Sequence, residues 1–206
     1  MNQSADGATD EVIARRWWIL LVLAGTQLLV QLDTNVVNTA LPAIAREFEA
    51  SSATLQWTVD AYLLAFAGLL LLAGALGDRY GRRRLLAIGM IAFALASVVA
   101  AFSTTAEMLI ACRAAQGIGG ALVVPQTLSL LTAVFPREER ARAIGIWTGA
   151  LGLGMAGGPL VGGGLVDSIG WEAVFWIPAP IAAVAFLGLA IVPESRAPGA
   201  PRLDLM

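Results

Sequence analysis

The 206-residue sequence contains no histidine, no lysine and a single cysteine, Cys112. With one cysteine, an internal disulfide and a thiolate metal site are excluded. Without histidine, proton transfer near neutral pH falls to carboxylates in unusual surroundings. Charged residues are 14% of the chain and hydrophobic residues 58%, whereas about a quarter of a soluble domain is charged. The composition therefore excludes an ordinary water-soluble domain and favours a membrane protein.

Long apolar stretches, each bounded by charges or turn residues, run through the whole sequence. They cover residues 17–41, 53–76, 85–102, 108–135, 143–166 and 171–192. Each has about 18 residues or more, enough for a helix to cross ~30 Å of hydrocarbon. None alternates with the period of two that a membrane barrel needs. The sequence therefore predicts an all-α integral membrane protein with a bundle of six transmembrane helices over residues 17–192.

The arginines predict how this bundle is oriented. If residues 1–16 are a cytosolic tail, eleven arginines lie on the cytosolic side and only Arg46 lies outside. Basic residues gather on the cytosolic side of membrane proteins, and the polar, acidic start of the chain differs from a secretory signal. An even number of spans returns residues 193–206 to the cytosol, as a tail or as a linker to a missing second half. We expect a multi-pass protein of the cytoplasmic (inner) membrane with both termini cytosolic.

Three ionisable residues, Asp33, Asp60 and Arg113, lie inside the predicted spans. At a rise of 1.5 Å per residue, all three lie roughly 8–12 Å from the outer end of their span. A charge at such a depth costs at least ~2.5–3.5 kcal/mol, so unpaired positions facing lipid are unfavourable. We expect Asp33 and Arg113 to pair in the interior. Asp60 is the weaker candidate, because its side chain could instead extend to the outer interface.

Polar side chains accompany these charges. In the first span they recur at helical spacing, at Gln27, Gln31, Thr34, Asn35 and Asn38. Gln116 lies three residues from Arg113 and so shares its face of the helix. Two interpretations stay open: the polar groups hold helices together, or they line a wet cavity where a carboxylate binds and releases protons. The candidate coupling and cavity residues are Asp33, Arg113, Asp60, Gln31, Asn35 and Gln116.

Two further segments have unusual compositions. The loop "GALGDRYGRRRLL", residues 74–86, places four arginines and an aspartate between apolar stretches. Orientation explains the arginines but not the fixed offsets of Gly74, Asp78 and Gly81. Residues 145–164 contain nine of the chain's 22 glycines. Gly154, Gly158 and Gly162 recur every four residues, a pattern that lets a neighbouring helix approach closely.

Together these segments resemble the N-terminal half of a major facilitator superfamily transporter. The loop resembles the family signature G-x-x-x-D-R-x-G-R-R, carried by Gly74, Asp78, Arg79, Gly81, Arg82 and Arg83. "LDTNVVNTALP" resembles the first-span motif of drug:proton antiporters, with Asp33 at its acidic position, and "RAAQGIGG" the fourth-span motif, with Arg113 and Gln116. The span-five antiporter motif is carried by Gly154, Gly158, Pro159, Gly162 and Gly163. With "WTVDAYLLA" in span two, the resemblance is closest to the fourteen-span subfamily.

The resemblance implies a fold and a function. The fold is the N-terminal bundle of the major facilitator fold, built of 3+3 inverted repeats. The function is proton-coupled efflux of amphipathic drugs or small organic compounds, with the proton motive force as energy source and no cofactor, catalytic residue or metal. The implied partners are the lipid bilayer, a small amphipathic substrate, protons and a second half of six or eight spans, either missing or from another chain. The loop signature implies a gate in which Asp78 contacts helices of both halves.

Alternatives remain beside efflux. The subfamily usually has a basic residue after the position of Trp171 and a later asparagine before a proline, whereas this chain has Glu172 and Pro178. A symporter of another small solute, or a non-transporting fragment or assembly subunit, would carry many of the same motifs. The net charge of −2 gives no indication of nucleic acid binding. An enzyme is least favoured, because the sequence contains no nucleophile–base pair, metal cluster or phosphate loop.

Overall fold

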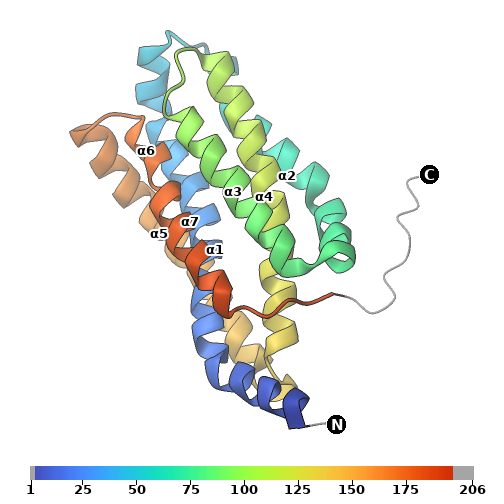
Figure 1. Ribbon diagram of the computed structural model, residues 1–206. Coiled ribbons are helices and arrows are strands. Elements are labelled where there is room, and N and C mark those ends of the chain that lie inside the picture. Colours follow the sequence, from blue (N-terminus) through green and yellow to red (C-terminus); the bar gives the residue numbers. More distant parts are fainter. Residues whose placement is uncertain (1–2, 197–206) are drawn as a thin grey trace.

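The computed structural model describes residues 3–196, with side chains from residue 15 onward, as a bundle of helices (Figure 1). The helices are α1 (Gln3–Glu47), α2 (Ser52–Tyr80), α3 (Arg82–Ala100), α4 (Ala106–Val134), α5 (Arg137–Ser168), α6 (Ala173–Trp176), α7 (Pro178–Gly188) and the 3₁₀ turn η1 (Leu189–Ile191). Six segments in this range are long and apolar enough to cross a membrane. The predicted all-α, six-span architecture is therefore confirmed. Residues 1–2 and 197–206, parts of the two predicted tails, lie outside the described residues.

Most helices extend beyond the predicted apolar spans. The largest difference is at the start of the chain, where α1 begins at Gln3 and not at Trp17. Polar caps explain other ends: the side chain of Ser51 accepts a hydrogen bond from the N–H of Thr54, and Thr105 accepts one from Met108. Such caps satisfy amide groups that have no partner within the helix. Hydrophobicity alone marks the part of a helix that lies in lipid and leaves out its polar end turns.

The sixth span is interrupted, which the sequence analysis did not predict. Here α6 ends at Trp176 and α7 begins at Pro178. Proline has no amide hydrogen, so the regular helical hydrogen-bond pattern cannot continue through it. The hydroxyl of Ser97, buried on α3, donates to the carbonyl oxygen of Phe175 at 2.7 Å beside the interruption. The carbonyl that loses its helical donor to Pro178 is that of Val174, one residue before the Phe175 carbonyl, so Ser97 links the interrupted stretch to α3.

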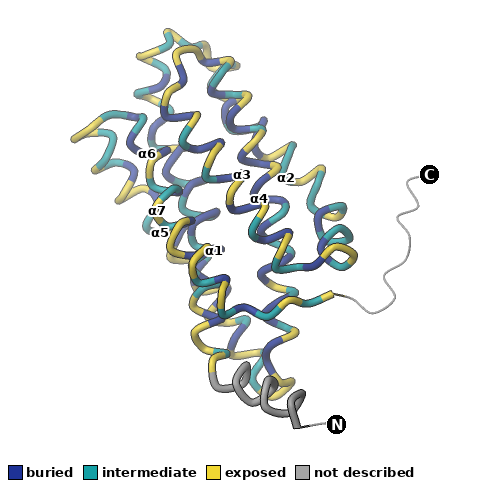
Figure 2. The backbone as a smooth tube through the Cα atoms, in the orientation of Figure 1, coloured by how far each residue is buried: buried dark blue, intermediate teal, exposed yellow. Residues whose placement is uncertain are grey.

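The bundle has a buried centre and two exposed edges. Helix α4 packs against α2 and α3, α1 packs against α5 and α7, and contacts between α1 and α4 join the two groups. Figure 2 shows the buried stretches along α1 and α4. More than half of the apolar window of each of these two helices is buried (56%), against 11% for α2 and 22% for α5. The centre of the bundle is therefore the contact between α1 and α4.

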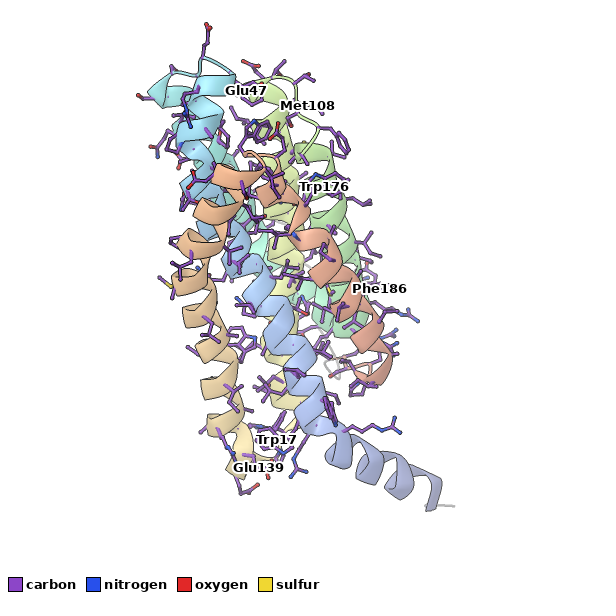
Figure 3. All side chains as sticks on the ribbon, turned by 90° about the vertical axis from the view of Figure 1, so that its left-hand side faces the viewer. Trp17, Glu47, Met108, Glu139, Trp176 and Phe186 are labelled. Atoms are coloured by element: carbon purple, nitrogen blue, oxygen red, sulfur yellow. The ribbon has the colours of Figure 1, made fainter. Side chains whose placement is uncertain are left out.

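The two ends of the bundle differ in charge. Figure 3 shows Trp17 and Glu139 at one end and Glu47 and Met108 at the other. The first end carries the α2–α3 loop, with Arg82 and its neighbours, and the arginines at the start of α5. We call it the arginine-rich end. Its guanidinium groups contact aromatic rings as well as acids: Arg142 lies 5.0 Å from the ring centre of Trp17.

Candidate functional site

An ion pair lies at the contact between α1 and α4. Nη1 of Arg113 donates to Oδ2 of Asp33 at 2.7 Å, and both side chains are at most 1% exposed. The predicted contact between these two residues is thus present. A buried pair is favourable only if its remaining donors and acceptors also find partners. The surroundings of the pair therefore decide whether it can be stable.

Gln116 provides two of these further contacts. Its Nε2 donates to Oδ1 of Asp33 at 3.1 Å, and its Oε1 accepts from Nη1 of Arg113 at 2.8 Å. Gln116 can reach both charges because it lies one turn after Arg113 on the same face of α4. Both carboxylate oxygens of Asp33 are hydrogen-bonded as a result. Asp33, Arg113 and Gln116 close a ring of hydrogen bonds, which we call the buried ring.

Tyr62 of α2 covers one face of the Arg113 guanidinium. The guanidinium carbon lies 4.5 Å from the centre of the tyrosine ring, and Tyr62 is 3% exposed. A cation over an aromatic face is stabilised by the ring's quadrupole, most strongly away from water. Phe66, one turn later on α2, stacks against the Tyr62 ring with ring centres 5.9 Å apart. The sequence analysis missed Tyr62 because it searched the spans for charges, and the partner here is neutral.

Asp60 lies apart from the buried ring. Its carboxylate accepts from Nε2 of Gln56 at 3.1 and 3.2 Å, in an exposed position one turn earlier on α2. Asp60 and Tyr62 are two positions apart in the sequence, which is about 200° around a helix. Asp60 therefore points away from the face of α2 that covers Arg113. This position agrees with the alternative that its side chain extends towards the outer interface.

Gln31 and Asn35 lie towards α5. Nδ2 of Asn35 donates to the carbonyl oxygen of Gln31 at 2.7 Å, so its amide bonds to its own helix. A Cβ added at Gly154 would lie 2.9 Å from Cβ of Gln31, and one at Gly158 would overlap Asn35. Gln31 and Asn35 therefore face α5, and a common cavity with Asp33 stays a prediction. Asp33 is about 200° from each of them around α1 and faces α4.

The residues of the glycine motif of α5 fall into two groups, one packed against α1 and one facing away from it. Gly154, Gly158 and Gly162 are buried against α1, where added side-chain atoms would collide with that helix. Around Gly163 nothing lies within 4 Å of an added Cβ among the described residues. Pro159 is exposed. Close packing explains the first three positions, and the other two face outward.

The α2–α3 loop contains a second arginine–aspartate pair. Nη2 and Nε of Arg82 donate to Oδ1 of Asp78 at 2.7 and 2.9 Å. Between them Gly81 has φ = 112°, a conformation that residues with a Cβ rarely adopt. Gly74 approaches Pro125 of α4, at 3.9 Å from an added Cβ, and the Arg79 guanidinium lies 5.3 Å from the ring centre of Tyr80. The signature residues thus form the turn itself and its contact with α4.

The segment after η1 caps the start of α3. Gly81 offers no side chain as a cap, and Oε1 of Glu194 instead accepts from the backbone N–H of Arg83 at 3.0 Å. The carbonyl oxygen of Ser195 accepts from the N–H of Arg82, also at 3.0 Å. Nε of Arg84 lies 3.9 Å from the Glu194 carboxylate. We call this contact the Glu194–Ser195 cap; no local pattern predicts it, since its partners are 111 residues apart.

Comparisons with known proteins agree with this fold and these motifs. The chain matches the Major Facilitator Superfamily over residues 23–204. It is 44% identical over 199 residues to the multidrug efflux pump LfrA of Mycolicibacterium smegmatis, across 96% of this chain and 40% of LfrA. It is 42% identical over 193 residues to the puromycin resistance protein pur8 of Streptomyces alboniger, across 93% of this chain and 38% of pur8. The chain spans about two fifths of the length of these relatives.

A solved structure supports the fold independently. The crystal structure of a bacterial homologue of the human lysosomal transporter Spinster, inward-facing and unoccupied, superposes with a TM-score of 0.75 at 23% identity. The match covers 92% of this chain and 46% of that protein. The relatives are efflux and resistance proteins, consistent with the predicted drug:proton antiporter subfamily. The chain belongs to the major facilitator superfamily and is similar to the N-terminal half of its drug transporters.

Proposed function

We propose that this chain forms the N-terminal half of a proton-coupled efflux carrier for small amphipathic compounds. The family and the fold are those of a transporter rather than an enzyme. The names of the relatives support export of drugs or antibiotics. The observation that carries proton coupling is the buried ring, because it holds a carboxylate with no exposed side-chain surface against a guanidinium in the middle of the bundle. The proton motive force, and not a bound cofactor, supplies the energy in this proposal.

Proton binding at Asp33 changes the stability of the ring. A proton on the carboxylate removes its charge and leaves Arg113 buried without a counter-ion. Separating such a pair costs about 3–5 kcal/mol, enough to shift a two-state equilibrium by more than a hundredfold. Protonation therefore favours any arrangement of the helices in which Arg113 finds another partner or water. Proton uptake on one side and release on the other would then drive the change of access.

We propose that the arginine-rich end lies in the cytosol. Ten of the arginines in residues 15–196 lie at that end of the bundle, Arg46 lies at the other end, and Arg113 lies in between. The positive-inside rule supports a cytosolic position for both termini in the cytoplasmic membrane. The exposed edges α2 and α5 offer surface for a second half of six or eight spans, from another chain or from a longer protein.

Transport into everted membrane vesicles tests the proposal. The chain is produced alone and together with the C-terminal part of LfrA, and uptake of a fluorescent amphipathic cation is followed with proton release. We expect uptake only when both halves are present, loss of coupled uptake in Asp33→Asn, and retention in the matched control Asp60→Asn. Coupled uptake that survives Asp33→Asn would refute proton coupling at the ring. Movement of protons and substrate in the same direction would favour the symporter alternative.

A further inference from the structure

A groove runs along the outer surface of the bundle between α3 and α7. It consists of two adjoining hollows of about 370 and 280 Å³ that share Phe186 and Leu187. Figure 3 shows Phe186 on the outside of α7. The larger hollow reaches Leu95 and Ala179, and the smaller one ends at Arg83. Every other described residue that lines the groove is apolar, so Arg83 is the single charge among them.

The length of the groove matches one leaflet of a bilayer. From Arg83 to Leu95 the helix rises about 18 Å at 1.5 Å per residue. One half of a hydrocarbon core is about 15 Å thick. The groove therefore begins with a cation at the arginine-rich end and continues as apolar surface over the depth that an acyl chain occupies. A phospholipid has this same order of an anionic phosphate followed by an apolar chain.

The guanidinium of Arg83 has no acidic partner among the described residues, whereas those of Arg82 and Arg84 each lie beside a carboxylate. The guanidinium of Arg82 is bonded to Asp78, and that of Arg84 lies 3.9 Å from Glu194. The Arg83 side chain is half-buried and makes no hydrogen bond or ion pair with any residue in the described range. The nearby Glu194 carboxylate accepts the backbone N–H of Arg83. An anion at the groove mouth would thus meet one uncompensated positive charge.

A separate hollow elsewhere on the bundle carries a negative charge instead of a positive one. Between α5 and α6, towards the other end of the bundle, a hollow of about 440 Å³ is lined by Ile169 and Trp176 and carries Glu172 as its charge. A phosphate there would meet a carboxylate. The groove between α3 and α7 and this hollow therefore differ in the sign of their charge, and of these two the groove is complementary to an anionic lipid.

We propose that the groove between α3 and α7 binds an anionic phospholipid, with an acyl chain along Ile91 and Leu187 and its phosphate at Arg83. Basic groups between transmembrane helices on the cytosolic side are a recurring site for anionic head groups. The assignment to the cytosolic leaflet rests on the proposed orientation of the bundle. The binding itself does not depend on transport, so it is testable on the chain alone.

Native mass spectrometry of the purified 206-residue chain in detergent tests the site. Phosphatidylglycerol and phosphatidylcholine with identical acyl chains are added in parallel. We expect phosphatidylglycerol to remain bound at several-fold lower concentration. Arg83→Gln should weaken its binding about fivefold, the value expected for one arginine near a membrane surface. The matched control Arg84→Gln makes the same charge change outside the groove and should weaken binding less than twofold.

A second pair of variants tests the apolar part of the groove. Ala183 lines the groove and is exposed, so Ala183→Leu fills it without disturbing the core. We expect this variant to lose phosphatidylglycerol binding, while Ala156→Leu, which adds the same three carbons on α5, keeps it. Equal binding of the two lipids, equal losses in Arg83→Gln and Arg84→Gln, or unchanged binding in Ala183→Leu would each overturn the proposal. Equal thermal unfolding of all four variants confirms that they are folded.

Discussion

Two arginine–aspartate pairs in this chain have the same shortest distance, 2.7 Å, in different surroundings. In the buried ring, the side chains of Arg113 and Asp33 are 1% and 0% exposed. In the α2–α3 loop, Arg82 and Asp78 are 18% and 39% exposed. Losing one partner of a buried pair costs about 3–5 kcal/mol, whereas an exposed pair contributes about 0–1 kcal/mol. Equal geometry therefore gives unequal energies, because water replaces the lost partner in one place only.

The difference suits the gating role that the family resemblance implies for the loop and the coupling role proposed for the buried ring. A pair that opens and closes as a gate has to break and re-form without a large barrier, and the loop pair meets this condition. A pair that couples a proton to a conformational change has to respond strongly to the loss of one charge, and the buried ring meets that condition. The predictions below test this contrast, from the largest expected effect to the smallest.

Arg113→Ala should have the largest effect. It leaves the Asp33 carboxylate buried without its counter-ion, so we expect the free energy of unfolding to fall by about 3–5 kcal/mol. Chemical denaturation of the purified chain in detergent measures this loss. Asp33→Asn is the second single variant, and the double variant Asp33→Asn with Arg113→Ala should recover part of the stability. Effects of the two changes that add to within about 0.5 kcal/mol would show that the residues do not interact.

Tyr62→Leu should have the next largest effect. It removes the aromatic face beneath the Arg113 guanidinium, and a desolvated cation–π contact is worth about 2 kcal/mol. Tyr62→Phe keeps the ring and should retain most of that stability in the same denaturation assay. If both variants lose equal stability, the hydroxyl and not the ring is responsible, and the proposed contact with Arg113 has no energetic role.

Glu194→Ala tests the Glu194–Ser195 cap. Removing a helix cap typically costs about 1 kcal/mol, here at the first turn of α3. We expect faster hydrogen exchange at the amides of residues 82–85, read by mass spectrometry, with little change elsewhere. Arg84→Ala is the control, because it removes the ion pair and leaves the cap. Unchanged exchange in Glu194→Ala would mean that water caps α3 equally well.

Asp78→Asn should have the smallest effect on stability and a complete effect on transport. The pair with Arg82 is partly exposed, so we expect the free energy of unfolding to change by no more than about 1 kcal/mol. In vesicles that contain both halves, transport should be lost, because the neutral amide cannot anchor the arginines of the gate. Normal transport at normal expression would show that the loop serves orientation only.

The sequence was sufficient for the spans and for the ion pair, for a physical reason. Charge inside an apolar run is costly, so Asp33 and Arg113 stand out, and counting residues from the span ends places both at one depth. Tyr62 could not be found in this way, because a neutral ring gives no sign of a cation partner. The division of α1 into a face for α4 and a face for α5 needed the helix neighbours, since Gln31 and Asn35 share their spacing with other polar residues. The cap at Glu194 depends on how two distant segments meet.

The interrupted sixth span is joined to α3 at both of its ends. Near one end Ser97 donates to the carbonyl oxygen of Phe175, and near the other Glu194 and Ser195 accept the first amides of α3. The Ser97–Phe175 contact is buried, and a backbone group in hydrocarbon that loses its partner finds no water to replace it. Sliding of one helix along the other would break contacts about 22 Å apart at the same time. We therefore expect α3 and the sixth span to move together in a rearrangement of the bundle.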